Sequence, residues 1–136
     1  MGALMQLQII TPDRVLCDEP AKIVEMRTAE GEITVFPGHI PVTVMMVPGI
    51  VHITMEDDSI RRAAVHDGFV ELQPDKITIM AEIAEWPEDI DLERAKEALA
   101  RARERIATPS ADTDMPRARR AWERAKTRIE LLTREW

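Results

Sequence analysis

The sequence is poor in the residues that form covalent crosslinks, and it has no long apolar run. Its 136 residues include one cysteine, Cys17, so an internal disulfide and a thiolate metal cluster are both excluded. The longest apolar run, residues 40–47, is interrupted by Pro41 and Thr43 and is far too short to span a bilayer. Residues 1–6 lack the basic and apolar regions of a signal peptide. We therefore expect a cytoplasmic chain without a transmembrane segment.

The motifs of common catalytic sites are missing as well. There is no Walker glycine-lysine loop, no Gly-x-Gly-x-x-Gly, no Gly-x-Ser-x-Gly and no His-Glu-x-x-His. The three histidines, His39, His52 and His66, share no metal-ligand spacing, and nothing in the sequence requires a metal. His39 lies in the rigid segment 37–41 and is expected to orient a loop rather than transfer protons. The chain is predicted not to be an enzyme; the alternative from a different class is a small β-sandwich enzyme that uses His39 or His66.

Acidic and basic residues are unevenly distributed along the chain. Residues 1–87 hold 6 Lys/Arg and 14 Asp/Glu, a net charge of −8, whereas residues 117–136 hold 7 and 3, a net charge of +4. An acidic body argues against nucleic-acid binding, which depends on phosphate neutralisation by Lys and Arg. The basic C-terminal segment predicts an anionic partner, either a ligand or an acidic protein surface.

The first part of the chain has the pattern of an all-β domain. Met5, Leu7 and Ile9 alternate with polar residues, as in a half-buried strand. Further short β-rich runs follow, each bounded by proline, glycine or aspartate, so we expect a sandwich or barrel over residues 1–86. These runs cover residues 21–27, 32–36, 42–47, 50–55, 60–65, 69–72 and 76–81.

Residues 87–136 have a helical pattern instead. Apolar residues fall at alternating three- and four-residue steps from Leu92 to Ile106 and again from Ala118 to Trp136. The segment 108–112 ends the first helix, and Asp114 can cap the second. Two such helices with a short connection predict an antiparallel hairpin.

The two helices repeat one motif. The pattern Asp-x-x-Arg-Ala-x-x-Ala-x-x-Arg-Ala-x-x-Arg-Ile occupies residues 91–106 and recurs, shifted by 23 residues, at 114–129. Folding the hairpin could bring its arginines together, and their mutual repulsion would then favour a phosphate between them. The alternative is a solvated face of ion pairs such as Glu130 with Arg134, and the residues alone favour that alternative.

Three segments carry a resemblance to a known family. Residues 29–42 (AEGEITVFPGHIPV), 64–81 (AVHDGFVELQPDKITIMA) and 90–95 (IDLERA) resemble motifs of the epsilon subunit of bacterial F-type ATP synthases, in the same order. Asp67 departs from the pattern, because the family usually has a glycine there. Aspartate tolerates a left-handed turn, so we expect the fold to be unaffected and local contacts to a partner to differ at this position.

The resemblance implies a flattened ten-stranded β-sandwich followed by an antiparallel two-helix hairpin. The sandwich, residues 1–86, would dock on the gamma subunit and the c-ring, with Glu32 and His39 near those partners. The hairpin, residues 87–136, would be either compact or extended into the catalytic alpha/beta head, where it inhibits ATP hydrolysis. The subunit would be non-catalytic and peripheral, at the cytoplasmic face of the membrane.

The resemblance also implies a regulatory ligand. In some bacterial members the compact form binds ATP without hydrolysing it. The other interpretation within the family is a purely structural rotor subunit without nucleotide sensing. The residues of this sequence that match the ATP-binding positions are Glu85, Ile90, Asp91, Arg94, Ala95, Arg101, Arg124 and Arg128.

Overall fold

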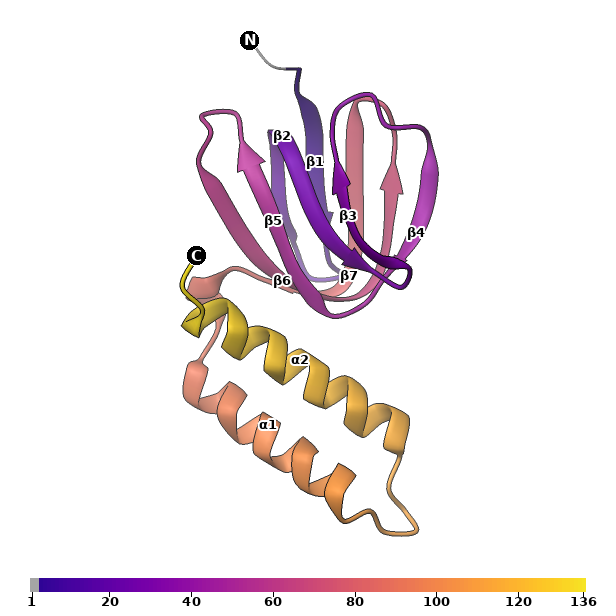
Figure 1. The fold of residues 1–136 in the computed structure, drawn as a ribbon, viewed down its shortest axis with the longest axis vertical. Coiled ribbons are helices and arrows are strands. Elements are labelled where there is room, and N and C mark those ends of the chain that lie inside the picture. Colours follow the sequence, from indigo (N-terminus) through magenta and orange to yellow (C-terminus); the bar gives the residue numbers. More distant parts are fainter. Residues whose placement is uncertain (1–2) are drawn as a thin grey trace.

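The protein consists of a β-rich front part and a helical hairpin beneath it (Figure 1). The computed structural model describes residues 3–136, so the first two residues of the expected sandwich domain lie outside it. A single 3-10 turn, η1 (Pro87–Asp89), joins the two parts. The helices are α1 (Leu92–Ala107) and α2 (Met115–Thr133). The strands are β1 (Met5–Ile10), β2 (Val15–Thr28), β3 (Gly31–Val35), β4 (Val42–Met46), β5 (Gly49–Met55), β6 (Ile60–Leu72) and β7 (Lys76–Glu85).

The sheet closes on itself around the core. Strand β1 pairs antiparallel with β2 on one side and parallel with β7 on the other. Met5, Leu7 and Ile9 are buried whereas Gln6 is exposed, so the alternation seen in the sequence is confirmed. Cys17 also faces the core, where burial raises the pKa of its thiol, as expected for a structural cysteine.

The β-sandwich architecture is confirmed, but residues 3–136 form seven continuous strands rather than ten. Three strands are long and change partners along their length. Strand β2 pairs with β1 and then with β3 and β5, while β6 pairs with β5 and then with β4. Strand β7 pairs with β1 only over residues 76–80. Splitting these three strands where their partners change gives the expected number.

Strand β6 also runs through Asp67 and Gly68, where the sequence pattern predicted a break between two strands. Both residues have positive φ, 58° and 136°, yet the pairing with β7 resumes in the same register. A Cβ added at Gly68 would lie 2.1 Å from the carbonyl oxygen of Met80, so only glycine permits this close approach. The strand is locally kinked rather than ended, and the kink lies on the hairpin side of the sheet.

The hairpin forms as the sequence predicts. The side chains of Asp91 and Asp114 cap α1 and α2 by accepting a hydrogen bond from the backbone N–H three residues later, at Arg94 and Arg117. The Asp-x-x-Arg part of the repeat therefore has a structural reason. The two helices meet along an alanine seam, in which every side chain is at most 4% exposed. This seam consists of Ala95, Ala102, Ala118 and Ala125.

Helix α2 lies between the sandwich and α1 (Figure 1). It packs against β5, β6 and η1, with Leu131 buried at that interface. The predicted second stripe is wrong at its end, because α2 stops at Thr133 and Trp136 lies beyond it. The Trp136 ring is 5.0 Å from the ring of His52, and the guanidinium of Arg62 lies over it at 4.6 Å.

Candidate functional site

A pocket of about 430 Å³ lies where the sandwich, the linker and both helices meet. This volume falls within the range of sites that bind small molecules. Strand β7 contributes its last residue, the linker and α1 contribute most of the wall, and α2 contributes one arginine. The lining residues are Glu85, Asp89, Ile90, Asp91, Arg94, Ala95, Ala98, Arg101 and Arg128.

Seven of the eight residues predicted from the sequence line this pocket. The exception is Arg124, which lies one turn before Arg128 on α2 and points to the sandwich instead. Asp89 and Ala98 also line the pocket but were not among the predicted site residues. The acidic residues Glu88 and Asp89 before α1 were a signal for Asp89. Ala98 belongs to the repeated motif and lies one turn after Ala95 on the same face of α1.

Asp89 fixes the linker that carries the pocket. Its carboxylate accepts hydrogen bonds from Arg14 Nη2 at 2.7 Å and from the backbone N–H of Trp86 at 3.0 Å. These two bonds hold the pKa of Asp89 below its usual range. The Trp86 ring is largely buried, with the guanidinium of Arg61 3.8 Å above its centroid. The linker is therefore tied to the sandwich at both ends of η1, through Trp86 and Asp89.

Glu85 connects the sandwich to α2. Its Oε1 accepts from Arg128 Nε at 2.7 Å and lies 3.3 Å from Nε2 of His66, a side chain with no exposed surface. Burial by itself raises the pKa of Glu85, but the hydrogen bonds from His66 and Arg128 outweigh it and bring the pKa below its usual value. Burial lowers the pKa of His66, although the bond to Glu85 acts in the opposite direction. At neutral pH a neutral His66 therefore donates its Nε2–H to an ionised Glu85.

A second ion pair also joins α2 to the sandwich, this time to strand β6. Arg124 Nη1 lies 3.4 Å from Asp67 Oδ2, and both side chains are about a quarter exposed. Asp67 is one of the two residues at the kink of β6. Both α2 arginines named as site residues thus have carboxylate partners on the sandwich.

The remaining pocket arginines are available to an anion. Within residues 3–136, Arg94 and Arg101 form no ion pair, and both are exposed. The small side chains Ala95 and Ala98 lie on the α1 face between them. Guanidinium groups suit phosphate because they bind it through two hydrogen bonds. The geometry thus fits a phosphate-bearing ligand at the end of the alanine seam.

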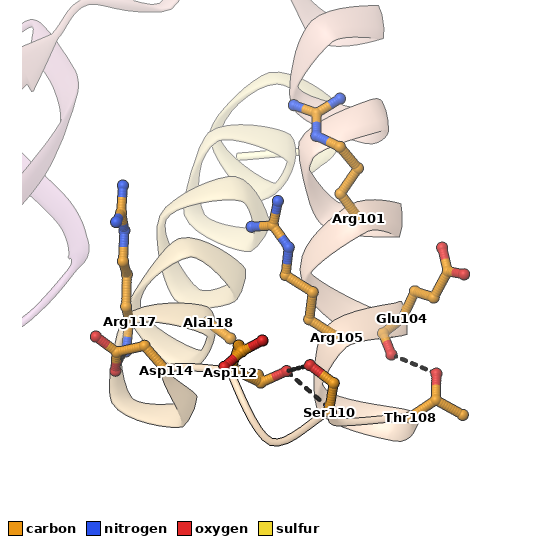
Figure 2. A pocket seen from close by; sticks show the side chains of 10 residues that line it. Arg101, Glu104, Arg105, Thr108, Ser110, Asp112, Asp114, Arg117 and Ala118 are labelled. Atoms are coloured by element: carbon orange, nitrogen blue, oxygen red, sulfur yellow. Dashed lines mark hydrogen bonds between the residues drawn. The ribbon is translucent and has the colours of Figure 1, made fainter.

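A larger hollow of about 670 Å³ lies at the tip of the hairpin (Figure 2). Arg101 and Arg105 project from α1 along one side of it, and Arg117 projects from the start of α2. Ser110 bonds to Thr113 across the turn, through its N–H at 2.9 Å and its hydroxyl at 3.1 Å. Both acids and bases line this hollow, and every charged group in it is exposed, so we assign no ligand to it.

The two residues expected at the partner surface lie on the sandwich. Glu32 is exposed on β3, and His39 follows that strand with its Nδ1 2.7 Å from the carbonyl oxygen of Ile40. Nearby in sequence are large apolar side chains that are 41–74% exposed. Apolar surface of this kind is typical of an interaction site. These side chains are Phe36, Ile40, Val42 and Met45.

Comparison with known proteins places this architecture in a family. The family model described as "ATP synthase, Delta/Epsilon chain, beta-sandwich domain" matches residues 4–87, and the model described as "ATP synthase, Delta/Epsilon chain, long alpha-helix domain" matches residues 88–132. The chain belongs to the ATP synthase delta/epsilon family. The resemblance stated from the three sequence segments is thereby confirmed, and so is the prediction of a non-catalytic subunit.

Individual relatives agree with this assignment. The chain is 41% identical over 108 residues to the ATP synthase epsilon chain of Brevibacillus brevis, covering 79% of this chain and 82% of the relative. It is 39% identical to the epsilon chain of Bacillus subtilis, covering 79% and 81%. A solved chain of the Euglena gracilis mitochondrial ATP synthase has a TM-score of 0.82 at 25% identity, covering 93% of this chain and 80% of that one.

Two further observations concern the membrane and metals. Among residues 3–136, no helix has both the length and the apolar character needed to cross a membrane. The same residues contain no group of three or more His, Cys, Asp or Glu side chains arranged to hold a metal ion.

Proposed function

We propose that this epsilon-type chain couples the gamma subunit to the c-ring in an ATP synthase and regulates ATP hydrolysis through its hairpin. ATP, bound but not hydrolysed, would favour the compact hairpin. The observation that carries this proposal is the pocket shared by the end of β7, the linker, α1 and α2. Seven residues that match the family's nucleotide positions line it, although they come from separate segments of the chain.

The pocket links ligand binding to hairpin position. Arg128 reaches it only while α2 rests on the sandwich, whereas Asp91 and Arg94 belong to the start of α1. A ligand that contacts the sandwich, α1 and α2 together binds the compact hairpin and not a hairpin that has left the sandwich. It therefore stabilises the compact state by RT ln(1 + [L]/Kd), about 2.7 kcal/mol at one hundred times its Kd.

The docking of the hairpin is modest enough for such a shift. Within the hairpin, α2 makes most of the contacts with the sandwich. These contacts are Leu131, the two ion pairs of Arg124 and Arg128, and Trp136 beyond the end of the helix. Two states that differ by a few kcal/mol respond to a ligand according to its differential affinity for them. With ATP scarce, the basic residues 117–136 would be free to meet acidic surface on the catalytic alpha/beta head and inhibit hydrolysis.

The sandwich would provide the coupling surface. We place the contact with gamma and the c-ring on the exposed apolar side chains around the β3–β4 connection, together with Glu32 and His39. In this arrangement the subunit is peripheral, at the cytoplasmic face of the membrane.

Calorimetric titration with ATP tests the regulatory half of the proposal. Arg94→Ala removes an exposed pocket guanidinium that has no carboxylate partner, while the backbone N–H that caps α1 remains. Losing one charged hydrogen-bond donor should weaken ATP binding by about tenfold or more. Arg120→Ala is the matched control, because Arg120 is an exposed α2 arginine that does not line the pocket. Absence of heat at millimolar ATP, or an equal loss in the control, would refute nucleotide binding at this site.

One observation favours the second candidate, a structural rotor subunit without nucleotide sensing. Arg124 and Arg128 already have carboxylate partners, so the hairpin can dock without a ligand. Under this alternative the titration gives no heat, whereas a pull-down with the full chain still recovers the gamma subunit.

A further inference from the structure

Asp67 occupies an unusual position for an aspartate. It lies in the middle of the long strand β6, yet its φ of 58° is left-handed, and it precedes Gly68, which is also at positive φ. Most side chains are strained in this region, whereas aspartate tolerates it. The kink leaves the Asp67 carboxylate on the side of the sheet that α2 covers, 3.4 Å from Arg124.

This contact explains why Arg124 is absent from the pocket wall. Arg124 and Arg128 are four residues apart and lie on the same face of α2. Arg128 pairs with Glu85, which itself lines the pocket, so its guanidinium stays at the pocket edge. Arg124 pairs with Asp67 on the neighbouring strand, and its guanidinium is not among the lining groups.

We propose that Asp67 is a built-in counter-ion that holds Arg124, and with it α2, on the sandwich when no ligand is bound, and that competes with a ligand phosphate for that guanidinium. The first half stands on the ion pair itself. The second half rests on the proposed nucleotide site. A phosphate can recruit Arg124 only after the contact with Asp67 is broken, so Asp67 lowers the affinity for ATP and weakens the dependence of docking on ATP.

The surrounding charges support this role. The groups facing Arg124 and Arg128 from the sandwich are Asp67, Glu85 and the neutral His66. Two carboxylates therefore balance two guanidinium groups across the interface, and no ligand is needed to relieve their repulsion. Removing the Asp67 charge leaves Arg124 partly buried without its partner, which favours undocking.

The docking role can be measured without nucleotide. Thr127 is 6% exposed and shares the α2 face of Arg124 and Leu131, so a thiol introduced by Thr127→Cys reacts only when α2 leaves the sandwich. In a Cys17→Ala background, we expect Asp67→Asn to speed labelling of that thiol by about twofold to fivefold, the range for a partly exposed ion pair. Asparagine keeps the shape and tolerates the left-handed φ.

The matched control is Asp58→Asn. Within residues 3–136, Asp58 is the other non-glycine residue at positive φ, with φ of 69°, and it pairs with Lys22 at 2.7 Å on the sandwich alone. This variant should leave the labelling rate unchanged. In an Arg124→Gln background, Asp67→Asn should also have no further effect. An unchanged rate in the Asp67→Asn single variant, or an equal increase in the Arg124→Gln background, would overturn the counter-ion role.

A parallel ATP titration tests the competition. Asp67→Asn should tighten ATP binding by about twofold to fivefold, and this gain should vanish when Arg124 is replaced by glutamine. A gain that persists in the Arg124→Gln background would mean general charge repulsion and would refute competition for Arg124. If the unsubstituted chain binds no ATP at millimolar concentration, the competition fails together with the proposed function. The labelling experiment still decides the counter-ion role independently.

Discussion

Acidification from pH 6.5 to 5.5 should weaken the folded chain through His66. This histidine is fully buried beside Glu85, and its pKa is lowered chiefly by that burial and further by the charges of Arg128 and Arg124. A lowered pKa in the folded state means that the unfolded chain binds more protons. The stabilisation is therefore complete above the unfolded pKa of 6.5 and is lost as the pH falls below it.

The size of the effect follows from one proton. If His66 stays neutral in the folded chain while the unfolded histidine titrates at 6.5, the free energy of unfolding falls by about 1 kcal/mol between pH 6.5 and 5.5. The pKa of Glu85 is also lowered, so Glu85 likewise stabilises the folded chain less as the pH falls. That stabilisation is lost below the ordinary pKa of 4.5, which lies outside this interval. Burial and the nearby charge of Arg62 lower the pKa of His52 as well. His52 therefore adds to the loss of unfolding free energy over this interval, and its contribution must be measured separately.

Urea unfolding followed by circular dichroism at the two pH values measures the loss. The comparison is with His66→Gln, which keeps a side-chain N–H for Glu85 but cannot titrate. The parent should lose about 1 kcal/mol more than this variant over the interval. A His52→Gln variant should keep the His66 contribution. If His66→Gln loses as much stability as the parent, a neutral buried His66 is not the cause of the pH dependence and the reasoning is wrong.

Three further predictions concern the fold and its docking. Gly68→Ala should lower the free energy of unfolding measured in urea by about 3 kcal/mol or more, because the added Cβ would clash with the backbone of Met80 and Ala81. Gly38→Ala should lower it by only about 1 kcal/mol, because open space surrounds Gly38 and only its φ of 90° is unfavourable for alanine. Deleting Trp136 removes its contact with Arg62 and should speed the undocking measured by thiol labelling by about fivefold; an unchanged rate would mean that the ring does not contribute. Ala102→Leu places a large side chain in the alanine seam and should lower the thermal stability of the helices while strand signals persist, and a single unshifted transition would contradict the seam packing.

The sequence predicted the elements that local pattern determines. The alternation in β1, the N-cap at Asp114 and the break after Ala107 were all recovered, because each depends on a few adjacent residues. The first half of β2 was missed, since Asp18, Glu19 and Pro20 there are typical of a loop. These residues form a strand because β1 pairs with them, and pairing of distant segments is not encoded in local propensity.

Most of the predicted site residues lie together in the structure, and the one exception is informative. Seven of eight residues line the pocket because the caps and helical periods fix where they lie relative to the linker. Arg124 differs because its partner, Asp67, is 57 residues earlier in the chain. Which strand would lie beneath α2 depends on how the hairpin docks, and no spacing in the sequence reports that. The departure at Asp67 was visible, but its partner was not.

The position of α2 between the sandwich and α1 also has a consequence for biosynthesis. On a ribosome the chain emerges from the N-terminus, so the sandwich and α1 are complete before the helix that joins them exists. Until then the alanine face of α1 has nothing to cover it, and a helix of 16 residues is only marginally stable alone. Docking must therefore wait until residues 131–136 have left the ribosome, because Leu131 and Trp136 contribute to the contact with the sandwich. A nascent chain stalled before residue 131 has emerged would present a finished sandwich with an undocked hairpin.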